Sequence, residues 1–198
     1  MRLTSARFVR LLHSYTSMLM LFIMLFFTVT GITLNHREWL PESSDRQLLD
    51  IDLPSELGQS EAWQADALAQ GDRVRRWLRT HHQVSGSQVR YDWDAEEQFL
   101  VIDIKRPGGY SLVEVDVIAK QLILEHHEAG WMSTLNDLHM GRYSGELWRG
   151  FIDASAIAML LFTLTGFWLV LPQKKRRTRL LVLTVVGLGV MLGAYSFM

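Results

Sequence analysis

The sequence predicts an integral membrane protein of the α-helical class, with three transmembrane helices and a small α+β domain inserted after the first helix. Three observations lead to this prediction. The 198-residue chain is 48% hydrophobic, and many of its apolar residues lie in long runs without charge. Basic residues flank these runs unevenly. About 110 residues between the first and second runs instead show the short alternating patterns of β-strands.

The charge-free runs are long enough to cross a bilayer. At 1.5 Å per residue, about 20 residues of helix span a hydrocarbon core of roughly 30 Å. The runs are Tyr15–Leu34, Ala154–Leu171 and Leu180–Met198. The first run and its upstream arginines also resemble a signal peptide, but the run is long and no small-x-small cleavage site follows it. We therefore expect it to remain as a membrane anchor.

The basic residues predict the orientation. Arg2, Arg7 and Arg10 precede the first run, and "QKKRRTR" (Gln173–Arg179) joins the second to the third. Cytoplasmic loops carry the excess of Lys and Arg, so both segments are expected on the cytoplasmic side of a bacterial inner membrane, with the central domain and the C-terminus in the periplasm. The expected divisions are 1–36 (N-terminus and first helix), 37–148 (periplasmic domain), 149–172 (second helix), 173–179 (basic loop) and 180–198 (third helix).

The periplasmic segment reads as one helix followed by an antiparallel meander. Apolar residues recur at mostly helical spacing over Ser60–Gln83, with Ser60 as the N-cap and Gly71 as a weakening residue. Alternating runs begin at Gln88, Gln98, Tyr110 and Lys120. "PGG" at Pro107–Gly109 is a strong turn signal between two of them. We expect the helix to pack on one face of the sheet.

Cysteine is absent, which excludes disulfides, iron–sulfur clusters, covalently attached haem and thiol catalysis. Histidine is therefore the residue type on which metal or redox chemistry depends. His13 lies near the inner end of the first helix, and His36 lies just past its outer end, about 35 Å away along a helix. His139 precedes the second helix on the outer side. His13 and His36 cannot share one metal ion.

Two segments carry a resemblance to a known family: "RLLHSYTSMLMLFIMLFFTVTGITLNH" from Arg10 and "LNDLHMGRYSGELWRGFIDASAIAMLLFTLTGFWL" from Leu135. With the helix-plus-meander domain, they make the chain similar to bacterial PepSY-associated transmembrane proteins. Haem-containing members of that group are similar to inner-membrane siderophore-iron and ferric reductases. The resemblance implies haem b and electron transfer to ferric iron or a ferric siderophore in support of iron uptake, although the chain is smaller than its larger relatives.

The resemblance and the histidine positions together suggest ligand sets. A haem with two imidazole ligands needs one on each face of the porphyrin, and His36 with His139 is the membrane-proximal pair on the outer side. His13 has no partner in the second or third helix, so it is either not a ligand or is paired across a homodimer. The haem count stays open: one or two per chain, or haems shared across a dimer. It also stays open whether these histidines are instead interfacial residues without a ligand role.

A repeated tetrapeptide closes the first two helices. "TVTG" at Thr28 and "TLTG" at Thr163 each follow an "LH" pair, Leu12-His13 and Leu138-His139. The two helices run in opposite directions, so the copies form a weak inverted repeat with one copy near each membrane face. Small and hydroxylated residues leave room beside a helix, for a cofactor or for another helix.

Further candidates lie in the outer region. Arg142 and Arg149 are candidates for holding haem propionates. His126 and His127, with Glu125 and Glu128, suggest a transient site for the iron substrate, or else a solvated segment. No flavin or nicotinamide motif is present, so the donor is expected to be a quinol or a membrane reductase; nucleic acid is not an expected partner. The competing function is a haem-free, membrane-anchored PepSY module that binds or regulates a periplasmic partner, so whether the chain is an enzyme stays open.

Overall fold

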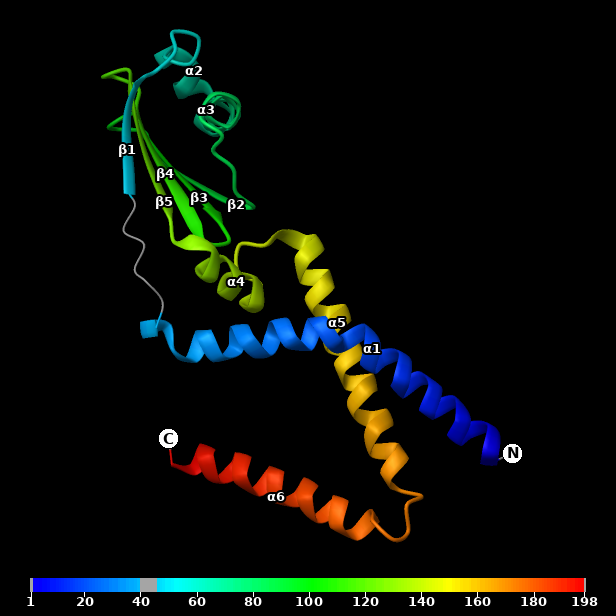
Figure 1. The fold of residues 1–198 in the computed structure, drawn as a ribbon. Coiled ribbons are helices and arrows are strands. Elements are labelled where there is room, and N and C mark those ends of the chain that lie inside the picture. Colours follow the sequence, from blue (N-terminus) through cyan, green and yellow to red (C-terminus); the bar gives the residue numbers. More distant parts are fainter. Residues whose placement is uncertain (1, 40–45, 198) are drawn as a thin grey trace. The chain divides into compact units, whose positions relative to one another are not determined.

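The computed structural model describes residues 2–39 and 46–197. The chain divides into two compact units, of which one holds the chain up to Phe26 and from Ile152 onward and the other holds Phe27–Phe151. Figure 1 shows the elements of both units along the colour gradient of the sequence.

Three helices are long and apolar enough to cross a membrane: α1 (Arg2–Asn35), α5 (Gly145–Val170) and α6 (Arg177–Ser196). They correspond to the three predicted spans, and α5 begins a few residues earlier than expected. Most of their large apolar side chains are exposed on the protein itself. Exposed apolar side chains around a long helix are what contact with lipid requires.

Five antiparallel strands form one sheet in the order β1-β5-β4-β3-β2. The strands are β1 (Arg46–Asp52), β2 (Gln88–Asp94), β3 (Phe99–Arg106), β4 (Gly109–Asp116) and β5 (Gln121–Glu128). The predicted meander is therefore found as β2 to β5. The prediction lacked β1, which pairs with β5 at the edge of the sheet and has almost entirely exposed side chains.

The predicted single helix is two helices, α2 (Ser60–Ala65) and α3 (Ala67–His81). The break falls at Asp66, whose carboxylate accepts a hydrogen bond from the Ala69 backbone N–H at 3.0 Å and so caps α3. Gly71, expected to weaken the helix, has a packing role. A Cβ there would lie 2.8 Å from Leu100 Cδ2, so the missing side chain lets α3 lie close against the sheet.

The core lies between these helices and one face of the sheet (Figure 1). Trp63, Val74 and Leu78 on the helices are buried, as their spacing predicted. The strand residues that complete the core alternate along their strands: Leu100, Ile102, Ile104, Val113, Val115, Leu122 and Leu124. The other face of the sheet is not covered in this way, which is common for an antiparallel sheet.

The segment between β5 and the second span is largely helical, as α4 (Gly130–Met140). Gly141 ends it in the left-handed conformation, with φ of 66°, which glycine adopts without a Cβ penalty. Asp137 Oδ2 accepts a hydrogen bond from the Gly108 N–H at 2.9 Å, so α4 is tied to the turn between β3 and β4. Trp148 Nε1 donates to the Leu138 carbonyl at 2.8 Å.

Replacing Gly108 with alanine is expected to destabilise the domain by about 2–4 kcal/mol. Its φ of +75° is costly for alanine, and a Cβ would lie 3.0 Å from the Thr134 Cα and closer still to the Thr134 side chain. Gly130→Ala is the matched control, because Gly130 has φ of +80° but nothing within 4 Å of its Cβ position. Urea unfolding of the two variants in detergent measures the difference, and equal losses would contradict the steric part.

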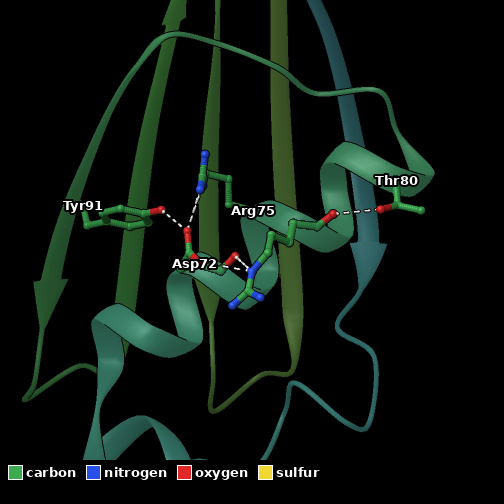
Figure 2. A network of polar contacts seen from close by, with 5 residues as sticks. Asp72, Arg75, Thr80 and Tyr91 are labelled. Atoms are coloured by element: carbon green, nitrogen blue, oxygen red, sulfur yellow. Dashed lines mark hydrogen bonds and ion pairs between the residues drawn. The ribbon is translucent and has the colours of Figure 1, made fainter.

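A polar network joins α3 to β2, as Figure 2 shows. The Asp72 carboxylate accepts hydrogen bonds from Arg75 Nη2 at 2.7 Å and from the Tyr91 hydroxyl at 3.3 Å, and it lies 3.1 Å from Arg76 Nε. The hydrogen bond from Arg75 lowers the pKa of Asp72 below its ordinary value of 3.8. Burial is the main cause that raises the pKa of Tyr91.

The lowered pKa predicts an acid-sensitive contribution to stability. A carboxyl whose folded pKa is depressed stabilises the fold above its unfolded pKa, and this contribution is lost as the pH falls through the folded pKa. Asp72→Asn is therefore expected to reduce stability at pH 7 and to make its decline below about pH 4 shallower. Urea midpoints for both proteins between pH 7 and pH 3 measure this, and parallel declines would contradict it.

Candidate functional site

His13 on α1 contacts α5 through one ring nitrogen. Its Nδ1 lies 3.2 Å from the Phe162 carbonyl oxygen and 3.1 Å from Thr165 Oγ1. The imidazole also stacks on the Phe162 ring, with 4.8 Å between centroids and 10° between planes. A Cβ at Gly166 would lie 3.1 Å from His13 Cε1, so glycine leaves the room that the imidazole occupies. We call His13, Phe162, Thr165 and Gly166 the His13 cluster.

The hydrogen bonds assign the proton of the His13 ring. The Thr165 hydroxyl donates to the Leu161 carbonyl at 2.7 Å, so toward His13 its oxygen acts as the acceptor. The Phe162 carbonyl can only accept. Both partners therefore require a proton on Nδ1, and the neutral ring keeps a lone pair on Nε2. Within residues 2–39 and 46–197, no hydrogen bond to that Nε2 is formed.

His139, in the last turn of α4, meets α1 in the same way. Its Nδ1 lies 2.6 Å from Thr30 Oγ1, and the Phe27 ring packs edge-on against it at 5.0 Å and 69°. A Cβ at Gly31 would lie 3.6 Å from His139 Cε1. We call His139, Phe27, Thr30 and Gly31 the His139 cluster. Nearby, the Thr33 hydroxyl and Asn136 Oδ1 are 2.7 Å apart and add a second link between α1 and α4.

The two clusters are built from the repeat that the sequence shows. Each histidine contacts the second threonine and the glycine of the T-x-T-G copy on the other segment, so the copies are exchanged between the two halves. The phenylalanine that contacts each histidine directly precedes its copy, as Phe27 and Phe162. The repeat is thus "FTVTG" and "FTLTG". The phenylalanines were not among the predicted site residues, although this longer match was visible in the sequence.

The glycines have a different role from the one expected. The small residues of the T-x-T-G copies were expected to leave room beside a helix for a cofactor or for another helix. Instead, the side chain nearest to Gly31 is the imidazole of His139, and the side chain nearest to Gly166 is that of His13. Each glycine therefore makes room for a histidine of another helix.

His36 has contacts of its own. Its Nδ1 lies 3.2 Å from Glu38 Oε1, and its ring stacks on Trp39, with 3.9 Å between centroids and 4° between planes. Among the described residues no contact joins the His36 ring to the His139 ring, which uses Thr30 and Phe27. The structure thus does not bring the two rings together, and their pairing on one haem stays a prediction.

The remaining predicted residues are placed as follows. Arg142 and Arg149 are exposed, and Arg149 Nη1 donates to Glu146 Oε1 at 3.0 Å. His126 and His127 are neighbours on β5, so their side chains point to opposite faces of the sheet. His126 Nε2 accepts from Arg106 at 2.8 Å, whereas His127 lies beside the Tyr110 ring.

The two neighbouring histidines therefore do not converge on one iron site. Among the residues that the structure describes, no group of at least three His, Cys, Asp or Glu side chains is arranged to hold a metal ion. A transient iron site at His126 or His127 stays a prediction without a ligand cluster to support it.

Comparison with known proteins gives one match. A family model described as PepSY_TM-like matches residues 5–195, which is nearly the whole chain. Neither the curated proteins nor the solved structures contain a significant match.

Proposed function

Because the chain belongs to the PepSY_TM-like family, and is thus a membrane protein as predicted, we propose that it is a b-haem protein that carries electrons across the bilayer to ferric iron or a ferric chelate. The observation that supports this proposal most is the pair of matched histidine clusters. Each holds an imidazole through its Nδ1, and among the described residues neither Nε2 is hydrogen-bonded.

This donor arrangement fits axial ligation of haem iron. Histidines that bind metals usually donate the N–H of the other ring nitrogen to a carbonyl or another acceptor, which fixes the tautomer and the ring orientation. For His13 the Phe162 carbonyl and the Thr165 hydroxyl are such acceptors, and the Thr30 hydroxyl is the hydrogen-bond partner of His139 Nδ1. Bound b-haem supplies one-electron redox chemistry at these positions. His13 and His139 are the proposed ligands.

The other cluster residues position the imidazoles. Each threonine hydroxyl is hydrogen-bonded to Nδ1, each phenylalanine packs against the ring, and each glycine lets the ring lie close to the neighbouring helix. Arg142 and Arg149 remain the candidates for the propionates, which need cations in the interface region. Among the described residues, neither arginine is hydrogen-bonded to a histidine ring.

Each cluster offers one imidazole, so a bis-histidine haem needs a second ligand. For His13 we propose the same residue of a second copy of the chain, because α5 and α6 contain no histidine. A two-fold axis would place the two copies of His13 on opposite faces of one haem. For His139 the candidates are His36 of the same chain and His139 of the second copy.

The proposal includes the inner membrane as location, with the sheet domain in the periplasm. The positive charges at the N-terminal end of α1 and in the segment that joins α5 to α6 support this orientation. A quinol or a membrane reductase on the inner side is the proposed donor, and ferric iron or a ferric siderophore the acceptor. The chain then supports iron uptake by reduction outside the cytoplasm.

The orientation gives a separate prediction. An alkaline phosphatase reporter fused after Met198 is expected to be active, because that enzyme folds only in the oxidising periplasm. A reporter inserted at Lys175 is expected to be inactive. The opposite pattern would reverse the proposed direction of electron flow.

The experiment that tests the function uses the purified full chain in detergent. After stoichiometric reduction by dithionite, adding ferric citrate is expected to return the haem absorbance to the oxidised form. Gallium citrate is the control, since Ga³⁺ resembles Fe³⁺ in size and charge but is not reduced. A haem that stays reduced with ferric citrate would contradict the proposed acceptor.

One observation favours the competing function, a PepSY module that binds a partner. Val101, Leu112 and Ile123 lie on the face of the sheet away from the core, and Ile123 is 43% exposed. On this face Glu114 lies between Val101 and Ile123, so the face is amphipathic. Exposed apolar side chains on an uncovered face can contribute to an interaction surface. A chain that lacks haem and binds a periplasmic protein through this face would support that function.

A further inference from the structure

A pocket rich in arginine lies on the sheet domain, and none of its lining residues belongs to either histidine cluster. Its volume is about 360 Å³, and it is formed by α3, the loop after α3, the end of β3 and the residues before α5. Its basic side chains are Arg75, Arg76, Arg79 and Arg106. No carboxylate is among its described lining residues. We call it the arginine pocket.

The charge of the arginine pocket is only partly balanced. Asp72 pairs with Arg75 at 2.7 Å and with Arg76 at 3.1 Å, and Glu128 pairs with Arg106 at 2.8 Å. Two carboxylates thus face four guanidinium groups, which leaves about two positive charges at the pocket. Within the described chain, Arg79 has no carboxylate partner.

The same contacts hold the guanidinium groups in place. Figure 2 shows Asp72 between Tyr91 and Arg75, so Arg75 is fixed before any ligand arrives. Arg106 is also hydrogen-bonded to His126 at 2.8 Å. Groups that are already ordered lose less entropy on binding, which favours affinity for a small ligand.

The opposite wall is held by backbone geometry. The Ser87 hydroxyl donates to the Tyr143 carbonyl, and Tyr143 has φ of 53°, a conformation uncommon for a residue other than glycine. A Cβ at Gly86 would lie 2.6 Å from both Ile104 Cγ2 and the Lys105 carbonyl oxygen. The loop after α3 therefore lies tightly against β3 and keeps the pocket open beside the arginines.

We propose that the arginine pocket binds a phosphate group. Guanidinium forks match the oxygens of phosphate with paired hydrogen bonds, and a dianion balances the two excess charges. Two sources carry this group: a free phosphate, or the headgroup of an anionic phospholipid. The sequence supports the second source, because Ser144 in the pocket directly precedes α5, a candidate membrane span. This site does not depend on haem binding.

The experiment uses the purified full chain in an uncharged detergent. Inorganic phosphate is titrated calorimetrically into the wild type and into Arg79→Gln. Phosphatidylglycerol retained after extraction from mixed phosphatidylcholine and phosphatidylglycerol vesicles is measured in parallel. Arg73→Gln is the matched control, because Arg73 lies on the same helix but does not line the pocket. Arg79→Glu is the second variant, and circular dichroism checks the fold of each.

Arg79→Gln is expected to weaken binding by about 10-fold, the effect of losing one charge-assisted hydrogen bond, and Arg79→Glu by more. Arg73→Gln should leave it unchanged. A loss seen with inorganic phosphate assigns the pocket to a free anion, and a loss seen only in retained phosphatidylglycerol assigns it to lipid. The proposal is overturned if the wild type binds neither probe, or if the Arg73 and Arg79 variants behave alike.

Discussion

Replacing His139 with alanine is expected to remove the haem held at the His139 cluster and to abolish reduction of ferric citrate. The imidazole Nε2 is the proposed iron ligand, and alanine has no atom that can replace it. Membrane insertion should be unaffected, since His139 lies in α4 outside the apolar spans. Absorbance spectra of the reduced protein and the rate of iron reduction measure the effect. The rate of iron reduction should fall by more than about 100-fold.

Two further variants separate ligation from packing. His81→Ala should change neither the spectrum nor the rate, because His81 lies at the exposed end of α3 and its Nδ1 contacts only the Trp77 carbonyl. Thr30→Val removes the hydroxyl that is hydrogen-bonded to His139 Nδ1 while keeping the side-chain shape. It should retain haem but shift its reduction potential. An unchanged low-spin spectrum in His139→Ala would show that this cluster is a packing contact only.

Gly166→Val is expected to displace the His13 ring and to remove the haem proposed at that cluster. A Cβ would already lie 3.1 Å from His13 Cε1, and the larger valine side chain adds further overlap. Overpacking of this kind costs about 1–3 kcal/mol, and here the strain falls on the ligand itself. Haem content per chain, compared with that of His13→Ala, is the measurement.

Gly150→Val provides the matched control for this substitution. Gly150 also lies in α5, but apart from its chain neighbours and the backbone of its own helix, no described atom lies within 4 Å of its Cβ position. Any general cost of valine in the helix is therefore shared by both variants. If the two variants lose haem equally, the close contact between Gly166 and His13 is not the cause.

Much of the fold could be predicted because its signals are local. The alternation of Gln88–Asp94 matches β2 residue for residue, and the long apolar runs locate the three helices. The edge strand β1 was missed because its side chains are exposed on both faces, so no alternation marks it. The break at Asp66 was missed because the apolar period continues across it, and only the capping geometry reveals the new helix.

The candidate site was predictable in its residue types but not in its pairings. The sequence shows the histidines and both T-x-T-G copies, yet it cannot show that each histidine meets the copy on the other segment. Such contacts depend on how α1 packs against α5 and against α4. In each contact the histidine and its threonine are more than 100 residues apart in the sequence. His36 and His139 were paired because both lie near the outer side. In the structure the two rings have different neighbours: His36 contacts Glu38, and His139 contacts Thr30 of α1.

Haem content per chain tests the central claim most directly. The full chain is purified from cells supplied with a haem precursor, and its haem is measured as the pyridine haemochrome against protein concentration. A homodimer with one haem shared at the two His13 residues and one haem at each His139 cluster contains more than one haem per chain. Sharing at both levels gives one haem per chain. Either ratio, with the split bands of low-spin b-haem after reduction, is the predicted result, and a colourless protein without these bands would contradict the account.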